Sequence, residues 1–136
     1  MDALDNLVRI NQLKAEPPDP AEFQGMLRAA SLKLQDAQLS GLSKDSQFTL
    51  AYGAAHALAL AALRWHGYRS DKRYIVFQCL QHTLNLPAEE WRVFDLCHNR
   101  RNLAEYEGHL EIEDSLLKDL LRLTNKLVEK VNSLNK

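Results

Sequence analysis

Cysteine, glycine and proline are all scarce in this chain of 136 residues, which has two Cys, five Gly and four Pro. Cys79 and Cys97 are too few for a disulfide framework or a four-cysteine zinc site, and both lie in apolar stretches. We therefore expect buried free thiols in a cytoplasmic protein, since the cytosol keeps thiols reduced. The five histidines are scattered without metal-ligand spacing, so the sequence predicts no metal site and no cofactor.

The chain also lacks an excess of charge of either sign. Lys and Arg number 17 against 18 Asp and Glu, which gives a net charge of -1. This balance excludes a strongly basic nucleic-acid-binding protein, although it leaves room for a local basic patch. The most apolar run, residues 50–63, is shorter than the roughly 20 residues that span a bilayer. Asp2 and Asp5 stand where a signal peptide needs positive charge, so we expect no membrane association.

Strand-like alternation of apolar and polar residues is absent, and apolar side chains recur instead at helical spacing. Hydrophobic residues make up 46% of the chain and charged residues 26%, as in globular proteins. The connections between the expected helices are short, which favours antiparallel neighbours. The sequence therefore predicts a single all-α domain over residues 1–136, an up-and-down bundle of five to six helices.

The few Gly and Pro residues divide the chain into expected helices at residues 2–14, 20–38, 43–66, 71–84, 87–108 and 111–134. The first two are expected to form an N-terminal helical pair within residues 1–40, with Asp19 capping the second. Seven of the twelve residues 51–62 are alanine, which allows neighbouring backbones to approach closely, so we expect this helix at the centre. Tyr74, Trp91 and Phe94 are expected to face the core.

The expected last helix carries an apolar seam whose members alternate three and four residues apart: Leu117, Leu120, Thr124, Leu127, Val131 and Leu134. Such a seam suits either the core face of a bundle helix or a dimer interface. The sequence leaves both alternatives open.

Gly-rich phosphate loops and nucleophile elbows are absent, and the most informative segment is residues 98–106. Arg100 and Arg101 fall within the apolar arc of the expected helix instead of opposite it. A guanidinium there needs partners, and Glu105 is placed four residues on to pair with Arg101. The alternative is that both arginines line a crevice between helices or protomers and grip an anionic group such as a phosphate.

A second basic feature lies at residues 64–73, where four cations face a single acid, Asp71. The four cations are Arg64, Arg69, Lys72 and Arg73. Aromatic residues are interleaved with them, an arrangement that suits base stacking and binding of nucleic acid. The alternative is a solvated turn between helices with Trp65 and Tyr74 in the core.

Two segments of the chain together carry a combination typical of one known family. In residues 46–69 the relevant residues are Phe48, Ala51, Tyr52, Ala54, Ala55, Ala57, Ala61, Ala62, Leu63, Gly67, Tyr68 and Arg69. The second segment has the pair Arg101 and Asn102 with Tyr106 close behind, and His82 lies between the two. The first segment resembles the central helix of HEPN domains and the second their motif helix, so residues 43–123 resemble a HEPN core.

The resemblance implies a HEPN-like helical bundle, commonly a homodimer and often in a toxin–antitoxin or defence context. Many members are metal-independent endoribonucleases, whereas others have lost the catalytic residues and act as binding modules. If the chain is active, the resemblance makes Arg101, Asn102, Glu105 and Tyr106 its catalytic candidates. The implied partners are RNA or a nucleotide, a second copy of the chain, and a protein such as a cognate antitoxin or a nucleotidyltransferase-like protein.

The chain departs from the family pattern at the motif histidine, which follows the arginine after four to six residues. From Arg101 those positions hold Tyr106, Glu107 and Gly108, and His109 comes one residue too late. Arg92 and His98 have the required spacing, but they lie early, and a valine replaces the polar residue that should follow the arginine.

Without a positioned imidazole the usual proton-transfer group is missing. The sequence therefore favours a catalytically degenerate, dimeric module that binds RNA, a nucleotide or a partner through Arg100, Arg101, Asn102 and Tyr106. An endoribonuclease with an unusual Arg-Asn…Tyr motif is the first alternative. A helical protein–protein adaptor is the second.

Overall fold

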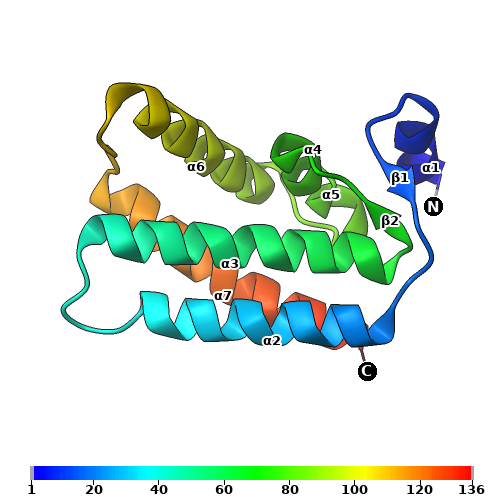
Figure 1. The fold of residues 1–136 in the computed structure, drawn as a ribbon, viewed down its shortest axis with the longest axis horizontal. Helices are drawn as coiled ribbons and strands as arrows, with labels where there is room; N and C mark the ends of the chain where they lie inside the picture. Colours follow the sequence, from blue (N-terminus) through cyan, green and yellow to red (C-terminus); the bar gives the residue numbers. More distant parts are fainter. Residues whose placement is uncertain (1, 136) are drawn as a thin grey trace.

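The computed structural model describes residues 2–135 and confirms the predicted all-α fold (Figure 1). Its helices are α1 (Asp2–Arg9), α2 (Pro20–Ala37), α3 (Lys44–Trp65), α4 (Arg73–Gln78), α5 (Leu80–Thr83), α6 (Ala88–Glu107) and α7 (Asp114–Leu134). Along the chain, α2, α3, α6 and α7 alternate in direction, as an up-and-down bundle requires (Figure 1).

Local sequence signals set the helix ends. Asp19 accepts hydrogen bonds from the backbone nitrogens of Ala21 and Glu22, and it is followed by proline at the first position of α2. Ser43 caps α3 in the same way through the backbone nitrogen of Ser46. At the C-terminal end of α6, Gly108 takes the left-handed conformation, φ 78°, that terminates many helices.

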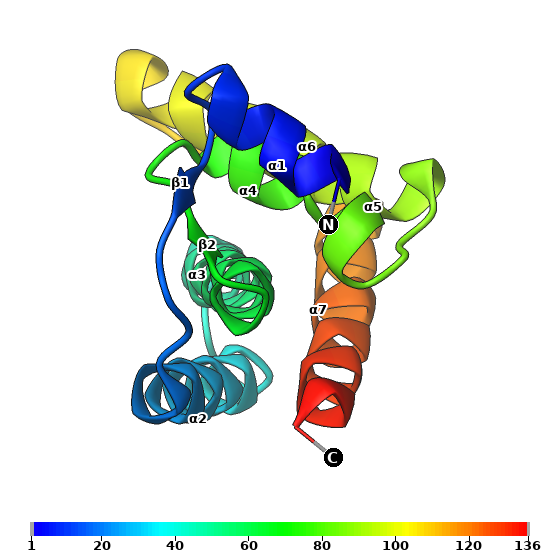
Figure 2. The same cartoon turned by 90° about the vertical axis from the view of Figure 1, so that its right-hand side faces the viewer.

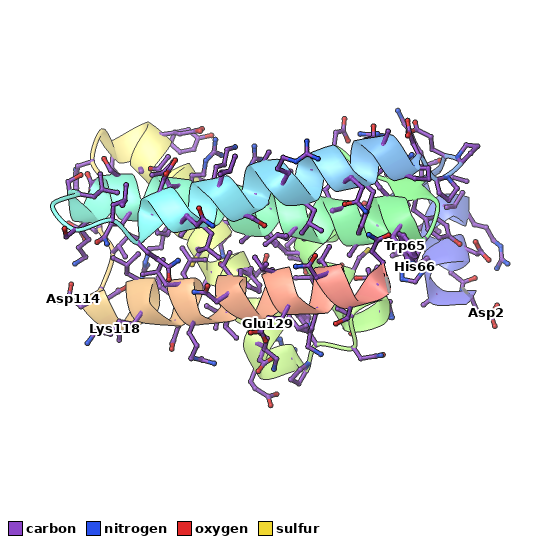
Figure 3. The ribbon with its side chains drawn as sticks, turned by 90° about the horizontal axis from the view of Figure 1, so that it is seen from below. Asp2, Trp65, His66, Asp114, Lys118 and Glu129 are labelled. Atoms are coloured by element: carbon purple, nitrogen blue, oxygen red, sulfur yellow. The ribbon has the colours of Figure 1, made fainter. Side chains whose placement is uncertain are left out.

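The helix α3 lies at the centre, as its alanines predict. It contacts α2 and α7 on one side and α4, α5 and α6 on the other. Its alanines at positions 51, 54, 55, 59, 61 and 62 are fully buried. Seen from below, α2 and α7 lie side by side and cover that side of α3, with Asp114 and Trp65 near opposite ends of the bundle (Figure 3).

The apolar seam of α7 faces the core, which decides between the two alternatives that the sequence left open. Leu120, Thr124, Leu127 and Val131 have no exposed surface, and Leu117 is 7% exposed. A dimer cannot use this seam without unfolding the bundle.

Trp91 and Phe94 are buried as predicted, whereas Tyr74 is 46% exposed and the expectation for it was wrong. Both cysteines are buried free thiols. Burial raises the pKa of Cys79 and of Cys97 to about 12, so the two sulfurs stay protonated and unreactive at neutral pH.

The N-terminal segment departs from the sequence prediction. The first helix ends at Arg9 instead of residue 14, and Asn11 follows in the left-handed region with φ 62°. Residues Lys14–Ala15 then form a short strand, β1, which pairs antiparallel with β2 (Tyr68–Arg69). The expectation of an all-helical chain was therefore wrong at these two places, where Pro17 favours an extended backbone at the preceding residue, Glu16, directly after β1.

The expected N-terminal helical pair does not form. The helix α2 packs along α3, whereas α1 lies on the opposite side of the bundle, near α4 (Figure 2). A hydrogen bond from the Tyr68 hydroxyl to the Asp5 carboxylate holds α1 against β2. The single helix expected at residues 71–84 is likewise divided into α4 and α5 at Cys79. No helix within residues 2–135 combines the length and apolarity that a membrane span requires.

Candidate anion-binding site

A cavity of about 480 Å³ opens between α2, α3, α4 and α6. Its lining residues are Lys33, Asp45, Phe48, Thr49, Tyr52, Gly53, Arg73, Arg101, Ala104, Glu105 and Leu110. Four helices therefore contribute to one hollow, and each of α2, α4 and α6 brings one cation to it.

Tyr52 forms the floor of this cavity. Its side chain projects from the alanine-rich part of α3 and is only 2% exposed. The guanidinium carbons of Arg73 and Arg101 lie 5.6 and 5.5 Å from the centre of the Tyr52 ring. Both distances fall within the range of cation–π attraction, so the ring holds two positive groups at the cavity from two different helices.

His98 lies behind Tyr52 and fixes its position. The Asn102 side-chain nitrogen donates to His98 Nε2 over 3.2 Å, which places the hydrogen of the neutral ring on Nδ1. His98 Nδ1 then donates to the Tyr52 hydroxyl oxygen, 2.8 Å away. Burial lowers the pKa of His98, so the ring is neutral at pH 7 and both of its nitrogens are engaged.

A second imidazole, His56, shows how positive this region is. Burial, with smaller contributions from the nearby cations Arg73, Arg101 and Lys33, lowers its pKa to about 4. Its Nε2 has no hydrogen-bond partner among residues 2–135. The ring stays neutral first because it is buried, and second because a proton on it would add positive charge to a group of cations.

The cations of the cavity are incompletely balanced. Arg101 Nη1 lies 3.7 Å from Glu105 Oε1, a loose pair in which 39% and 65% of the two side chains are exposed. Within the described residues, neither Lys33 nor Arg73 has a carboxylate within ion-pair distance. The cavity can therefore offer positive charge to an anionic ligand without first breaking a strong internal ion pair.

The predicted site on α6 is partly brought together. Arg101 is more than half buried, as its place on the apolar arc implied, and Asn102 and Glu105 lie around it. Tyr106 is 90% exposed and lies outside the cavity lining. Arg100 is directed to the α6–α7 connection, where its Nη2 donates to Glu113 over 2.6 Å.

The basic segment at residues 64–73 does not form a surface patch, so this part of the site prediction needs correction. Arg64 is 2% exposed, and its Nε donates to Glu22 over 2.5 Å while its other nitrogens donate to backbone carbonyls of Glu16 and Pro17. Arg69 pairs with the carboxylates of Glu16 and Glu22, at 2.9 and 2.6 Å.

Lys72 is exposed, and its Nζ donates to the Gln12 side chain of the N-terminal segment over 3.2 Å. Arg64, Arg69 and Lys72 therefore fix the N-terminal segment to the end of α3 and to β2. Of the four cations in the segment, only Arg73 reaches the cavity.

Sequence reasoning missed Lys33 and the part played by Tyr52 and His98. Lys33 comes from α2, far from α6 in the chain, and only packing brings the two close. The signal for Tyr52 was present, since it is a large aromatic residue among alanines and next to Gly53 on the central helix. Within residues 2–135, no group of three or more His, Cys, Asp or Glu side chains is arranged to hold a metal ion.

Comparison of the sequence with protein-family models and with curated proteins found no match.

Proposed function

We propose that the protein is a HEPN-like, dimeric binding module that holds the phosphate of RNA or of a nucleotide in the cavity over Tyr52. One observation carries this proposal: Lys33, Arg73 and Arg101 reach one cavity from three different helices. Guanidinium groups bind phosphate through paired N–H donors, and a lysine adds a point charge.

The aromatic residues of the cavity indicate which part of the ligand is recognised. Phe48 and Tyr52 are 1% and 2% exposed, so neither ring offers a face on which a base can stack. Contacts to phosphate carry no sequence information, whereas hydrogen bonds to base edges do. We therefore expect the module to bind RNA through its backbone or terminal phosphate, with little preference for sequence.

Binding without cleavage fits the site better than ribonuclease activity does. A general base must lie within hydrogen-bond reach of the proton that it removes. His98 has both nitrogens engaged, and neither His98 nor His56 lines the cavity. Glu105 lines it, but its carboxylate faces Arg101. An endoribonuclease with an Arg-Asn…Tyr motif is the less favoured alternative, since Tyr106 lies outside the cavity lining.

The homodimer, the protein partner and the toxin–antitoxin or defence setting belong to this proposal through the HEPN resemblance. A cognate antitoxin or a nucleotidyltransferase-like protein is the partner that the resemblance implies. An adaptor without an anionic ligand would leave the three cations of the cavity without a role.

Fluorescence anisotropy with a short 5′-phosphorylated RNA at low salt tests the proposal. Hydrogen bonds to charged groups contribute about 1.5–3 kcal/mol, so Arg101→Ala should weaken binding about tenfold or more. Arg101→Lys keeps the charge but loses the planar fork, and should weaken binding by less. Arg28→Ala, which removes an exposed cation of α2, is the matched control and should change little.

The melting temperature of Arg101→Ala should stay close to that of the wild type, because the loose and partly exposed Arg101–Glu105 pair contributes under about 1 kcal/mol. Full RNA affinity in folded Arg101→Ala protein would contradict the proposal. To test the ribonuclease alternative, the same RNA is incubated with the protein in the presence of EDTA and then analysed by size. Cleavage by the wild type that is lost in Arg101→Ala would establish a ribonuclease.

A further inference from the structure

The outer face of α6 carries large apolar side chains that the fold leaves uncovered. Leu96 is 41% exposed, Leu103 47% and Tyr106 90%. Figures 1 and 2 both place α6 along the upper edge of the bundle, and no helix lies above its C-terminal half. The side chains on the other face of the same helix, Phe94 and Cys97, are completely buried.

The residues of this face have a symmetrical order. At about 100° per residue, Arg92, Leu96, Asn99, Leu103 and Glu107 project within one narrow arc of α6. All five are exposed. Leu96 and Leu103 lie at equal distances from the point midway between residues 99 and 100. Arg92 and Glu107 lie farther out, again at equal distances from this point.

From this order we infer that the outer face of α6, defined by these five residues, docks antiparallel against the same face of a second copy of the chain. A two-fold axis through the midpoint places Leu96 against Leu103 of the second copy, and Arg92 against its Glu107. Such an interface is self-complementary, as two-fold symmetry demands. The inference rests on the homodimer of the proposed function and names the surface through which the dimer forms. It does not depend on the phosphate site.

Charge decides the direction of packing. Neither Arg92 nor Glu107 forms an ion pair within residues 2–135, so both are free to pair across an interface. A parallel arrangement would set Arg92 against Arg92 and Glu107 against Glu107, and like charges at close range repel. Only the antiparallel arrangement makes two opposite-charge pairs and two leucine contacts at once.

The size of the face sets the expected strength. The 20 residues of α6 extend over about 30 Å. One helix face covers less than the roughly 800 Å² per partner of a standard stable interface. We therefore expect a reversible dimer that dissociates on dilution. Arg101 lies on the opposite side of α6, so both cavities stay open in the dimer.

Variants with one added cysteine test the register under mild oxidation. A mixture of Leu96→Cys and Leu103→Cys proteins should form a disulfide-linked heterodimer, whereas each variant alone should not, because its own copies lie seven residues apart along the axis, about 10 Å. The native Cys79 and Cys97 are buried, and wild-type protein shows how much crosslinking they produce by themselves. Leu32→Cys, on the exposed face of α2, is the control and should stay unlinked.

Crosslinking of each variant with itself would indicate parallel packing and overturn the inference. Absence of any link, with a monomer mass by light scattering at high concentration, would overturn it as well. Dimerisation that persists unchanged in Leu96→Asp/Leu103→Asp protein would place the interface elsewhere and also overturn it.

Charge reversal supplies an independent measurement. Arg92→Glu and Glu107→Arg should each weaken the dimer, and the double variant should restore it, while Arg28→Glu should have no effect. Failure of the double variant to restore the dimer would contradict the antiparallel register. RNA affinity measured on the same variants should stay unchanged, so loss of the dimer and loss of the phosphate site are distinguishable.

Discussion

The Tyr52 hydroxyl and His98 Nδ1 lie 2.8 Å apart and join the central helix, α3, to α6 next to the cavity. The two rings are stacked almost parallel, with an interplanar angle of 10°. Because Asn102 holds the other nitrogen of His98, the tyrosine ring has one fixed orientation, and the guanidinium groups of Arg73 and Arg101 lie over it. The hydrogen bonds from Asn102 to His98 and from His98 to Tyr52 therefore fix the ring that holds the two cations at the cavity.

This arrangement predicts that Tyr52→Phe lowers the stability of the protein but leaves its RNA affinity nearly unchanged. The substitution leaves a ring for the two arginines but removes the oxygen that accepts from His98, which should lower the free energy of unfolding by about 1 kcal/mol. RNA affinity in the anisotropy assay should change little. Tyr106→Phe is the control and should alter neither quantity, because its side chain is 90% exposed. A large loss of affinity in Tyr52→Phe at unchanged stability would show that the hydroxyl contacts the ligand.

Arg64 is predicted to be structural. Its guanidinium is buried and donates to Glu22 and to two backbone carbonyls, so Arg64→Ala leaves several acceptors without a donor. Removing one partner of a buried ion pair costs about 3–5 kcal/mol, and the partial exposure of Glu22 places the expected loss near the lower end, about 3 kcal/mol. Urea unfolding measures it, with Arg28→Ala as the exposed control. A loss below about 1 kcal/mol would contradict the burial of this side chain.

The same network explains where the sequence misled. Residues 64–73 have a local excess of positive charge, but their counter-charges, Glu16 and Glu22, lie more than forty residues earlier. Counting charges along a window cannot detect acids that tertiary packing supplies. The strand pair β1–β2 was missed for a related reason, since two residues per strand leave no periodic pattern and the pairing depends on distant segments.

The helices were predictable because their signals are local. Caps such as Asp19 and Ser43, the prolines, and the spacing of apolar residues all act within a few positions. The cavity was predictable in part: Arg101 stood out as a cation on an apolar arc. Its companions Lys33 and Arg73 belong to other helices, and no pattern within one helix shows which cations of two others will meet it.

His56 predicts a pH dependence of stability. Its pKa is about 4 in the folded chain and 6.5 in the unfolded chain, so the unfolded state binds more protons between these values. Its contribution to stability is therefore complete above about pH 6.5 and is lost as the pH falls towards 4. The loss is about 1.4 kcal/mol per pH unit and about 3 kcal/mol in total.

His56→Gln should remove this dependence, so the difference in unfolding free energy between wild type and variant should change over that pH range. His109→Gln is the control. Its pKa is raised by the Glu111 side chain, so its effect has the opposite sign and is lost as the pH rises. Parallel pH profiles for wild type and His56→Gln would contradict the lowered pKa of the buried ring.

Gly53 lines the cavity from the middle of α3, and the space beside it predicts how substitutions there should behave. A Cβ at this position would meet the Lys33 side chain at 3.8 and 3.9 Å, an ordinary contact distance. Gly53→Ala should therefore stabilise the chain by about 0.5–1 kcal/mol, since alanine favours helix over glycine. Gly25→Ala on α2, where a Cβ would meet nothing within 4 Å, should give a similar gain.

Longer side chains at position 53 test whether the charge or the free volume of the cavity governs RNA binding. Gly53→Glu would place a carboxylate beside Lys33 and so supply an internal anion that competes with the RNA phosphate. Gly53→Gln has nearly the same size without the charge. If positive charge governs binding, anisotropy should show a much larger loss of RNA affinity for the glutamate variant, and added salt should weaken the residual binding of the glutamine variant as it does that of the wild type. Equal losses in both variants would mean that shape, and not charge, determines what enters the cavity.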